Sequence, residues 1–220
     1  MRAHPHQFHW RFLVARLVLP ALLALVVPAI AAAGDPDPQF ARLLSKASTL
    51  PSLGSFLEKF VGDCQGSEDR PSCEAQAKAF RAQATNKRFQ ILLGEDEARM
   101  LAPGAFGDDG YSVRIAPLFA AGGYAVTHGS PSKIDAQGNP VVSWIEAREE
   151  ANSEWNASQF QRLFSLRALR VQVVFTPQGV WSLPKKGGGK QFGVRAKVDG
   201  IYVTNGRTGD RVALWLADRS

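Results

Sequence analysis

The spacing of apolar residues changes once along this chain, and the change limits the folds that the chain can adopt. Before Phe89 the apolar residues recur every three or four positions, as they do between Phe40 and Ala47, and this is the period of a helix with one buried face. After Phe89 they alternate with other residues, most clearly between Phe192 and Val198, and this is the period of a strand. A helical first part followed by a sheet predicts the α+β class.

Four helices are expected, three before Phe89 and one within the later part of the chain. Asp37, Ser52 and Asn156 are polar residues of the kind that cap helix N-termini, and each precedes a run with helical spacing. Pro51 and Gly62 end the first two helices. The expected helices span about 38–50, 53–61, 71–86 and 156–166.

The strands are expected to pair in an antiparallel way. Turns as short as Gly122-Gly123 and Asn205-Gly206 favour this pairing, because parallel strands need a longer connection. The expected strands span 89–93, 111–119, 123–127, 141–146, 171–175, 192–198, 201–204 and 212–216. The predicted fold is therefore α+β, with three disulfide-stapled N-terminal helices packed on one face of an antiparallel sheet and one helix inserted in that sheet.

The N-terminus has the pattern of an export signal. Arg2, Arg11 and Arg16 are the only charged residues among the first 33, and residues 17–33 read LVLPALLALVVPAIAAA. This pattern predicts a signal peptide over 1–33, cleaved near residues 31–33. The alternative is an uncleaved anchor, because the run is only slightly shorter than the roughly 20 residues that span a bilayer. Residues 34–220 are expected to form one secreted or periplasmic domain, mainly helical over 34–88 and mainly sheet over 89–220.

Cys64 and Cys73 are the only cysteines of the chain. In an exported protein two cysteines at this distance are expected to pair, and the bond would join the second helix to the third. The alternative is a redox-active or nucleophilic thiol. The spacing is not Cys-x-x-Cys and no histidine is near in sequence, so the structural disulfide is favoured.

His128 is the only histidine after the signal, since the other three lie within the first nine residues. A general base there would need a nucleophile and an orienting acid; Ser130 is close in sequence, and Glu146 or Glu149 would have to be close in space. His128 is therefore a weak catalytic candidate. A single histidine also excludes a multi-histidine metal site, and no nucleotide motif is present, so no metal or cofactor is expected.

Charge is distributed unevenly along the chain. The whole sequence carries a net charge of +6, yet residues 155–198 contain no acid at all. Such a segment favours an anionic partner, unless the acidic first half of the same domain folds over it and cancels it. The candidate anion-binding residues are Arg162, Arg167, Arg170, Lys185, Lys186, Lys190, Arg195 and Lys197.

These features favour an exported, non-enzymatic binding or structural module of the bacterial cell envelope or periplasm. Its expected partner is an anionic envelope polymer, a lipid surface or another protein, and not a nucleic acid. The first alternative is a small-molecule or lipid carrier with an apolar cleft. Candidate lining residues for such a cleft are Trp144, Trp155, Trp181 and Trp215. The second alternative is a hydrolase that uses His128.

Overall fold

A computed structural model describes residues 37–64, 66–94, 98–100, 104–106, 110–150 and 156–219. All of them fall in one compact unit. The predicted signal peptide, residues 1–33, and its cleavage region lie outside the described residues. Within the described part of the chain, no helix is long and apolar enough to cross a membrane.

The four expected helices are present and begin where their capping residues predict. The first is shorter than expected, because it ends at Ser45 and residues Ser48–Thr49 form a short strand. Oxygens of Asp37, Ser52 and Asn156 accept hydrogen bonds from backbone N–H groups of the first turns, and Asp69 caps the third helix in the same way. The helices are α1 (Pro38–Ser45), α2 (Leu53–Val61), α3 (Arg70–Ala84) and α4 (Ala157–Ser165), followed by a short 3-10 turn, η2 (Ala217–Arg219).

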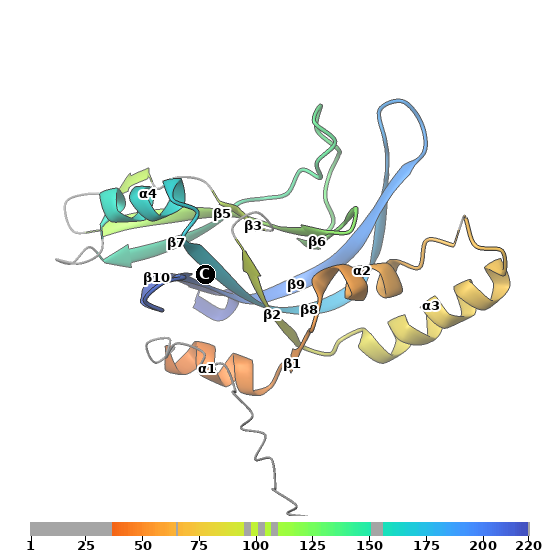
Figure 1. Ribbon diagram of the computed structural model, residues 1–220, viewed down its shortest axis with the longest axis horizontal. Coiled ribbons are helices and arrows are strands. Elements are labelled where there is room, and N and C mark those ends of the chain that lie inside the picture. Colours follow the sequence, from red (N-terminus) through yellow and green to blue (C-terminus); the bar gives the residue numbers. More distant parts are fainter. Residues whose placement is uncertain are drawn as a thin grey trace, which may run out of the picture. The chain divides into compact units, whose positions relative to one another are not determined.

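The described strands form one ten-stranded sheet (Figure 1). Its centre is a long antiparallel hairpin, because the strands expected at 192–198 and 201–204 are one continuous strand. The extra residue Asp199 is absorbed by a bulge opposite Val174 and Phe175, so the pairing continues through it. The strands are β1 (Ser48–Thr49), β2 (Phe89–Gly94), β3 (Ala98–Met100), β4 (Gly104–Phe106), β5 (Gly110–Ala121), β6 (Tyr124–His128), β7 (Ile145–Glu150), β8 (Leu169–Pro184), β9 (Lys190–Asn205) and β10 (Arg211–Leu216).

The sheet is mixed, so the prediction of a wholly antiparallel sheet is wrong. Strand β6 pairs with β9 in parallel, with Val126 opposite Val194, and β1 pairs with β2 in parallel. Short turns fix the direction only of strands that follow each other in sequence. The chain between β6 and β9 contains β7, α4 and β8, which is a connection long enough for parallel pairing.

The strand expected at 141–146 is also misplaced, since β7 begins at Ile145. Residues 132–141 fold back on themselves instead. Ile134 and Pro140 form an isolated bridge, and the backbone N–H of Val141 donates to the carbonyl of Lys133. The backbone groups of Val141 are therefore used locally and do not join the sheet.

The helices cover both faces of the sheet, and not one face as predicted. Phe40 of α1 packs with Val174 and Tyr202, whereas α2 and α4 belong to the main core that contains Val173. Val173 and Val174 are neighbours in β8 and so point to opposite faces. Figure 1 shows α1 and α4 on opposite sides of the sheet.

The predicted disulfide is present. Cys64, just after α2, is bonded to Cys73 in the first turn of α3, with 5.9 Å between their Cα atoms. Beside it, a Cβ atom at Gly62 would lie 2.2 Å from the Cβ of Ala77, so only glycine permits this close approach of the two helices. The end of α2 is thereby held against α3.

Candidate functional site

The long hairpin distributes the candidate anion-binding residues over three places. Arg170 lies at the start of β8 and Lys185 just beyond its end, so the two are about 50 Å apart along an extended strand. Arg162 and Arg167 accompany Arg170 at the first end. All eight residues are exposed, but they do not form one basic patch. The expectation of a single basic face therefore has to be replaced by three separate groups.

The middle group consists of Arg195 and Lys197, and Lys197 lies beside a buried acid. Asp199 is only 5% exposed, and its carboxylate accepts hydrogen bonds from Arg88 at 3.2 Å and Thr176 at 2.8 Å. The amine of Lys197 lies 3.4 Å from the same carboxylate. Part of the positive charge in this group is thus compensated inside the domain.

The third group stands at the turn of the β8–β9 hairpin. Lys185 and Lys186 line an open cleft of about 420 Å³ together with the turn that contains Asp135. The Asp135 carboxylate accepts hydrogen bonds from the backbone N–H groups of Gln137 and Asn139 in its own turn. An acid therefore stands beside these lysines and reduces the net positive charge of this cleft.

The ring of His128 is held by contacts with strand β9 and with Trp215. Its Nδ1 accepts the backbone N–H of Val198 at 3.0 Å, and its ring packs edge-on against Trp215. Burial lowers its pKa, the charge of Asp199 raises it, and the charge of Lys197 lowers it. The two acids considered as its partners bind elsewhere, because Glu149 accepts from Arg211 and the Leu214 N–H, and Glu146 pairs with Arg148.

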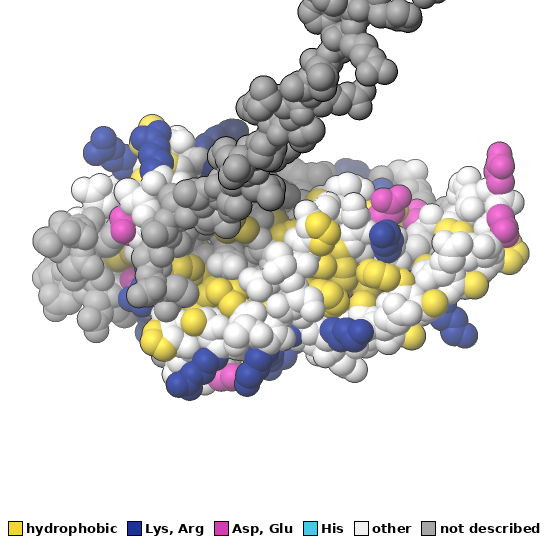
Figure 2. Space-filling view, turned by 60° about the horizontal axis from the view of Figure 1, so that its bottom comes forward, with side chains coloured by type: hydrophobic (Ala, Val, Ile, Leu, Met, Phe, Trp, Pro, Cys, Tyr) yellow, Lys and Arg dark blue, Asp and Glu magenta, His cyan; other side chains and the backbone are white. Residues whose placement is uncertain are grey.

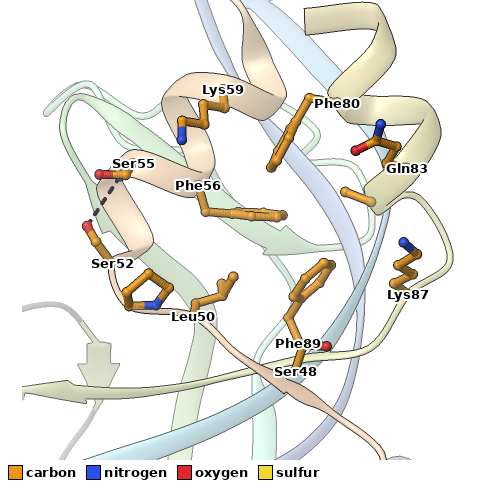
Figure 3. Close-up of a pocket in the computed structure, with 12 residues that line it drawn as sticks. Ser48, Leu50, Ser52, Ser55, Phe56, Lys59, Phe80, Gln83, Lys87 and Phe89 are labelled. Carbon is orange, nitrogen blue, oxygen red and sulfur yellow. Dashed lines mark hydrogen bonds between the residues drawn. The ribbon is translucent and has the colours of Figure 1, made fainter.

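An apolar groove of about 350 Å³ lies between α2, α3 and the edge of the sheet formed by β1 and β2. Its floor is made of aromatic rings. The ring of Phe56 lies 5.8 Å from that of Phe80 and 5.1 Å from that of Phe89, centre to centre. Figure 3 shows Phe56 between the other two rings, with Leu50 beside them. Phe56 is buried, while the other two rings remain partly open to the groove.

The floor of the groove is rigid because its rings pack on the core beneath it. Phe56 also contacts Phe60 and Phe175, so the floor continues into the main core of the sheet. The wall formed by α3 is fixed by Arg81, whose guanidinium donates to the carbonyls of Phe60 and Val61 at 3.1 and 3.0 Å. These carbonyls belong to the last turn of α2, where backbone acceptors lack partners within the helix. The two helices and the sheet are therefore joined to one another around the groove.

The rim of the groove is polar and basic. Lys59 and Lys87 stand on opposite sides of it (Figure 3), and both are exposed. None of the described residues that line the groove is acidic. Figure 2 shows hydrophobic side chains gathered on this side of the molecule, with Lys or Arg side chains and acidic side chains at the border. Such an arrangement suits a ligand with an apolar body and a negative group.

The groove is not lined by the tryptophans proposed from the sequence. Trp181 is buried in a small cluster with Leu118, Trp215 packs against the main core, and Trp144 is exposed under the guanidinium of Arg114. Trp155 lies outside the described residues. The groove residues were missed because they come from four segments, and Phe80 had the helical spacing of a core residue. One feature of the sequence could have indicated the groove. Lys87 and Phe89, a basic and an aromatic residue two positions apart, lie at the start of the strand β2.

Comparison with known proteins gives a family without an assigned activity. The model of the family described as "Family of unknown function (DUF6066)" matches residues 14–220. The chain matches no curated protein and no solved structure.

The contact of His128 predicts a loss of stability in mild acid. The lowered pKa means that the unfolded chain takes up this proton first as the pH falls through about 6.5. The melting temperature of the native protein should therefore fall between pH 7.5 and 5.5. In His128→Asn the amide oxygen replaces Nδ1 as the hydrogen-bond acceptor but does not titrate. The melting temperature of this variant should therefore fall less on acidification than that of the native protein. An equal loss in both proteins would contradict the role given to His128.

Proposed function

The chain belongs to the DUF6066 family of unknown function, and we propose that it is an exported, non-enzymatic binding protein of the bacterial cell envelope that holds an anionic amphiphile in the groove. The observation that carries this proposal is the composition of the groove, which has a floor of phenylalanine rings and two lysines at its rim. No acid is found among its described lining residues. This function corresponds to the carrier alternative, with the site moved from the tryptophans to Phe56, Phe80 and Phe89.

The apolar floor supplies affinity for a hydrocarbon chain. Each methylene that leaves water contributes roughly 0.8 kcal/mol, so a chain of six to eight methylenes would gain about 5–6 kcal/mol before the costs of ordering the ligand. The floor needs no rearrangement, since its rings already pack on one another. A volume near 350 Å³ lies at the small end of ligand sites and suits one medium-length acyl chain.

The rim selects the charge of the ligand. A carboxylate or phosphate at the mouth of the groove can reach Lys59 from one side or Lys87 from the other, while Ser52, Ser55 and Gln83 offer polar groups between them. Exposed ion pairs contribute only about 0.2–1 kcal/mol each. The lysines therefore discriminate between charged and neutral ligands, while the aromatic floor provides most of the affinity.

Export is supported by the N-terminal pattern and is consistent with the disulfide. We expect the exported protein to begin between Ala32 and Gly34 and to contain no free thiol, because Cys64 is bonded to Cys73. Intact mass spectrometry after alkylation without reductant measures both the N-terminal residue and the number of free thiols. Retention of Met1 on a membrane-bound protein would refute cleavage, and labelling of both cysteines would refute the disulfide.

The groove predicts preferential binding of an anionic amphiphile. Laurate should bind more tightly than dodecanol, which has the same chain length but no charge. The double variant Lys59→Gln/Lys87→Gln should weaken laurate binding about 2- to 30-fold, from 0.2–1 kcal/mol for each exposed pair, and leave dodecanol binding unchanged. Isothermal titration calorimetry with monomeric ligand measures these affinities.

The matched control is Lys46→Gln/Lys78→Gln, which removes the same charge from exposed positions outside the groove. It should change neither affinity. A second variant, Gln83→Trp, places a large ring at the rim and should reduce binding of both ligands. The proposal fails if neither ligand binds, or if the control pair weakens laurate as much as the groove pair does.

A further inference from the structure

We infer that the polar cleft between two projecting turns binds a saccharide that carries a negative group. One wall of this turn cleft is formed by residues 134–138, in the segment between β6 and β7, and the other by the turn of the β8–β9 hairpin. Figure 1 shows both segments, in green and blue, projecting on the same side of the sheet. Among the described residues the turn cleft and the groove share no lining residue, so the inference goes beyond the proposed function.

Hydrogen bonds within its own segment fix the first wall. The backbone N–H of Asp135 donates to the carbonyl of Asn139 at 2.8 Å. The Asp135 carboxylate accepts the backbone N–H groups of Gln137 at 3.0 Å and Asn139 at 2.7 Å, and the Asn139 amide donates to it at 3.3 Å. The carboxylate therefore shapes the wall, and the turn keeps its form without a ligand.

The second wall carries two lysines. Lys185 and Lys186 are exposed and line the cleft, and neither belongs to an ion pair of the described residues. Their charges are therefore available to a ligand. With Asp135 on the facing wall, the lining has a net charge of +1.

The tip of the hairpin leaves the lysines accessible. The N–H of Lys185 donates to the carbonyl of Gly189 at 3.1 Å and closes the turn. The three glycines at 187–189 have φ values of 95°, 103° and 76°, a backbone region that side chains rarely adopt. A Cβ atom on any of them would meet nothing within 4 Å. The turn thus presents its lysines beside a bare tip that no side chain screens.

The size and polarity of the turn cleft exclude simpler ligands. Its volume of about 420 Å³ lies within the range of small-molecule sites and far exceeds one phosphate or carboxylate group. None of its described lining residues is aromatic, and only Ile134 and Ala136 are apolar. An acyl chain in this cleft would leave the surrounding polar groups without hydrogen bonds, which costs free energy. The ligand therefore has to bring hydrogen-bonding groups as well as charge.

The lining offers hydrogen-bonding groups that match hydroxyls. Gln137 and Gln191 stand on opposite walls, and each side-chain amide has two N–H donors and a carbonyl acceptor. A hydroxyl both donates and accepts a hydrogen bond, so a ring with several hydroxyls can be held from both walls. Lysine binds an anionic group as a point charge. A saccharide with a phosphate or a carboxylate has both kinds of group.

A titration of the exported protein followed by NMR chemical shifts tests the site. In about 50 mM NaCl, where screening is weak, glucose 6-phosphate or glucuronate should shift the amide signals of residues 134–138 and 185–191. Glucose and inorganic phosphate should each bind more weakly than glucose 6-phosphate, because each has only one of the two kinds of group. The two acidic sugars distinguish a phosphate from a carboxylate as the preferred negative group.

Removal of the lysine charges should weaken binding of the acidic sugars. Lys185→Gln/Lys186→Gln should weaken binding of glucose 6-phosphate about 2- to 30-fold, the range for two exposed ion pairs. The matched control Lys46→Gln/Lys78→Gln removes the same charge from exposed positions outside the cleft and should leave this affinity unchanged. Laurate affinity should be the same in the native protein and in Lys185→Gln/Lys186→Gln, which separates the turn cleft from the groove.

Removal of the acid should have the opposite effect. In Asp135→Asn the amide oxygen can still accept the N–H groups of Gln137 and Asn139, so the turn keeps its shape. The affinity for glucose 6-phosphate should rise about 1.4- to 5-fold, the range for one exposed charge, while that for glucose should not change. Ala136 is exposed on the first wall, and Ala136→Trp should reduce binding of every sugar because the ring occupies the cleft.

The inference is overturned if neither acidic sugar binds, or if the shifted signals lie outside the two turns. Inorganic phosphate that binds as tightly as glucose 6-phosphate would also overturn it, since the lysines would then take up free anions only. Equal weakening by the control pair, or a lower affinity in a folded Asp135→Asn variant, has the same consequence.

Discussion

The pairing of β8 with β9 is the constraint on which the other elements depend. Each strand has sixteen residues, and β2, β6 and β10 all attach to this hairpin and not to one another. The bulge at Asp199 lies near the middle of the hairpin and buries a carboxylate that binds Arg88. Arg88 stands between Lys87 and Phe89, so this one buried contact fixes the segment that supplies a lysine and a ring to the groove.

The aromatic floor connects the hairpin to the groove. Phe175 of β8 contacts Phe56 and Phe89, and Phe56 contacts Phe80. Rings in such offset and edge-on contacts contribute beyond their buried area, and each one limits the movement of the next. The groove thus owes its shape to the core of the domain, whereas the charges at its rim are free to respond to a ligand. In the proposed function, the phenylalanine floor provides affinity for the apolar part of the ligand and the two lysines select its charge.

Local features of the fold could be predicted from the sequence, and features that depend on distant contacts could not. The caps at Asp37, Ser52 and Asn156 are set by the first turn of each helix, so they were placed correctly. The prediction of the sheet face that α1 covers was wrong. The apolar stripe around Phe40 resembles that of α2, and its spacing does not indicate which side of the sheet it contacts. The parallel pairing of β6 with β9 joins segments separated by nearly seventy residues, and no local turn specifies it.

The basic segment was recognised from its composition, but its arrangement in space was not. Charge counting places Arg170 and Lys185 in one group, whereas the long strand between them carries them to opposite ends of the hairpin. The groove could not be predicted from the sequence for a related reason. Phe80 and Phe89 each have an ordinary place in a helical or strand pattern, and only the packing of α3 against α2 brings them to one cavity.

The central claim, that the groove holds an acyl chain, is tested most directly by photocrosslinking. A fatty acid with a diazirine on its chain would be bound, irradiated, and located by peptide mass spectrometry. The account predicts adducts within residues 48–59 and 80–89, with competition by unlabelled laurate. Adducts confined to other parts of the chain, or adducts that laurate does not displace, would contradict it.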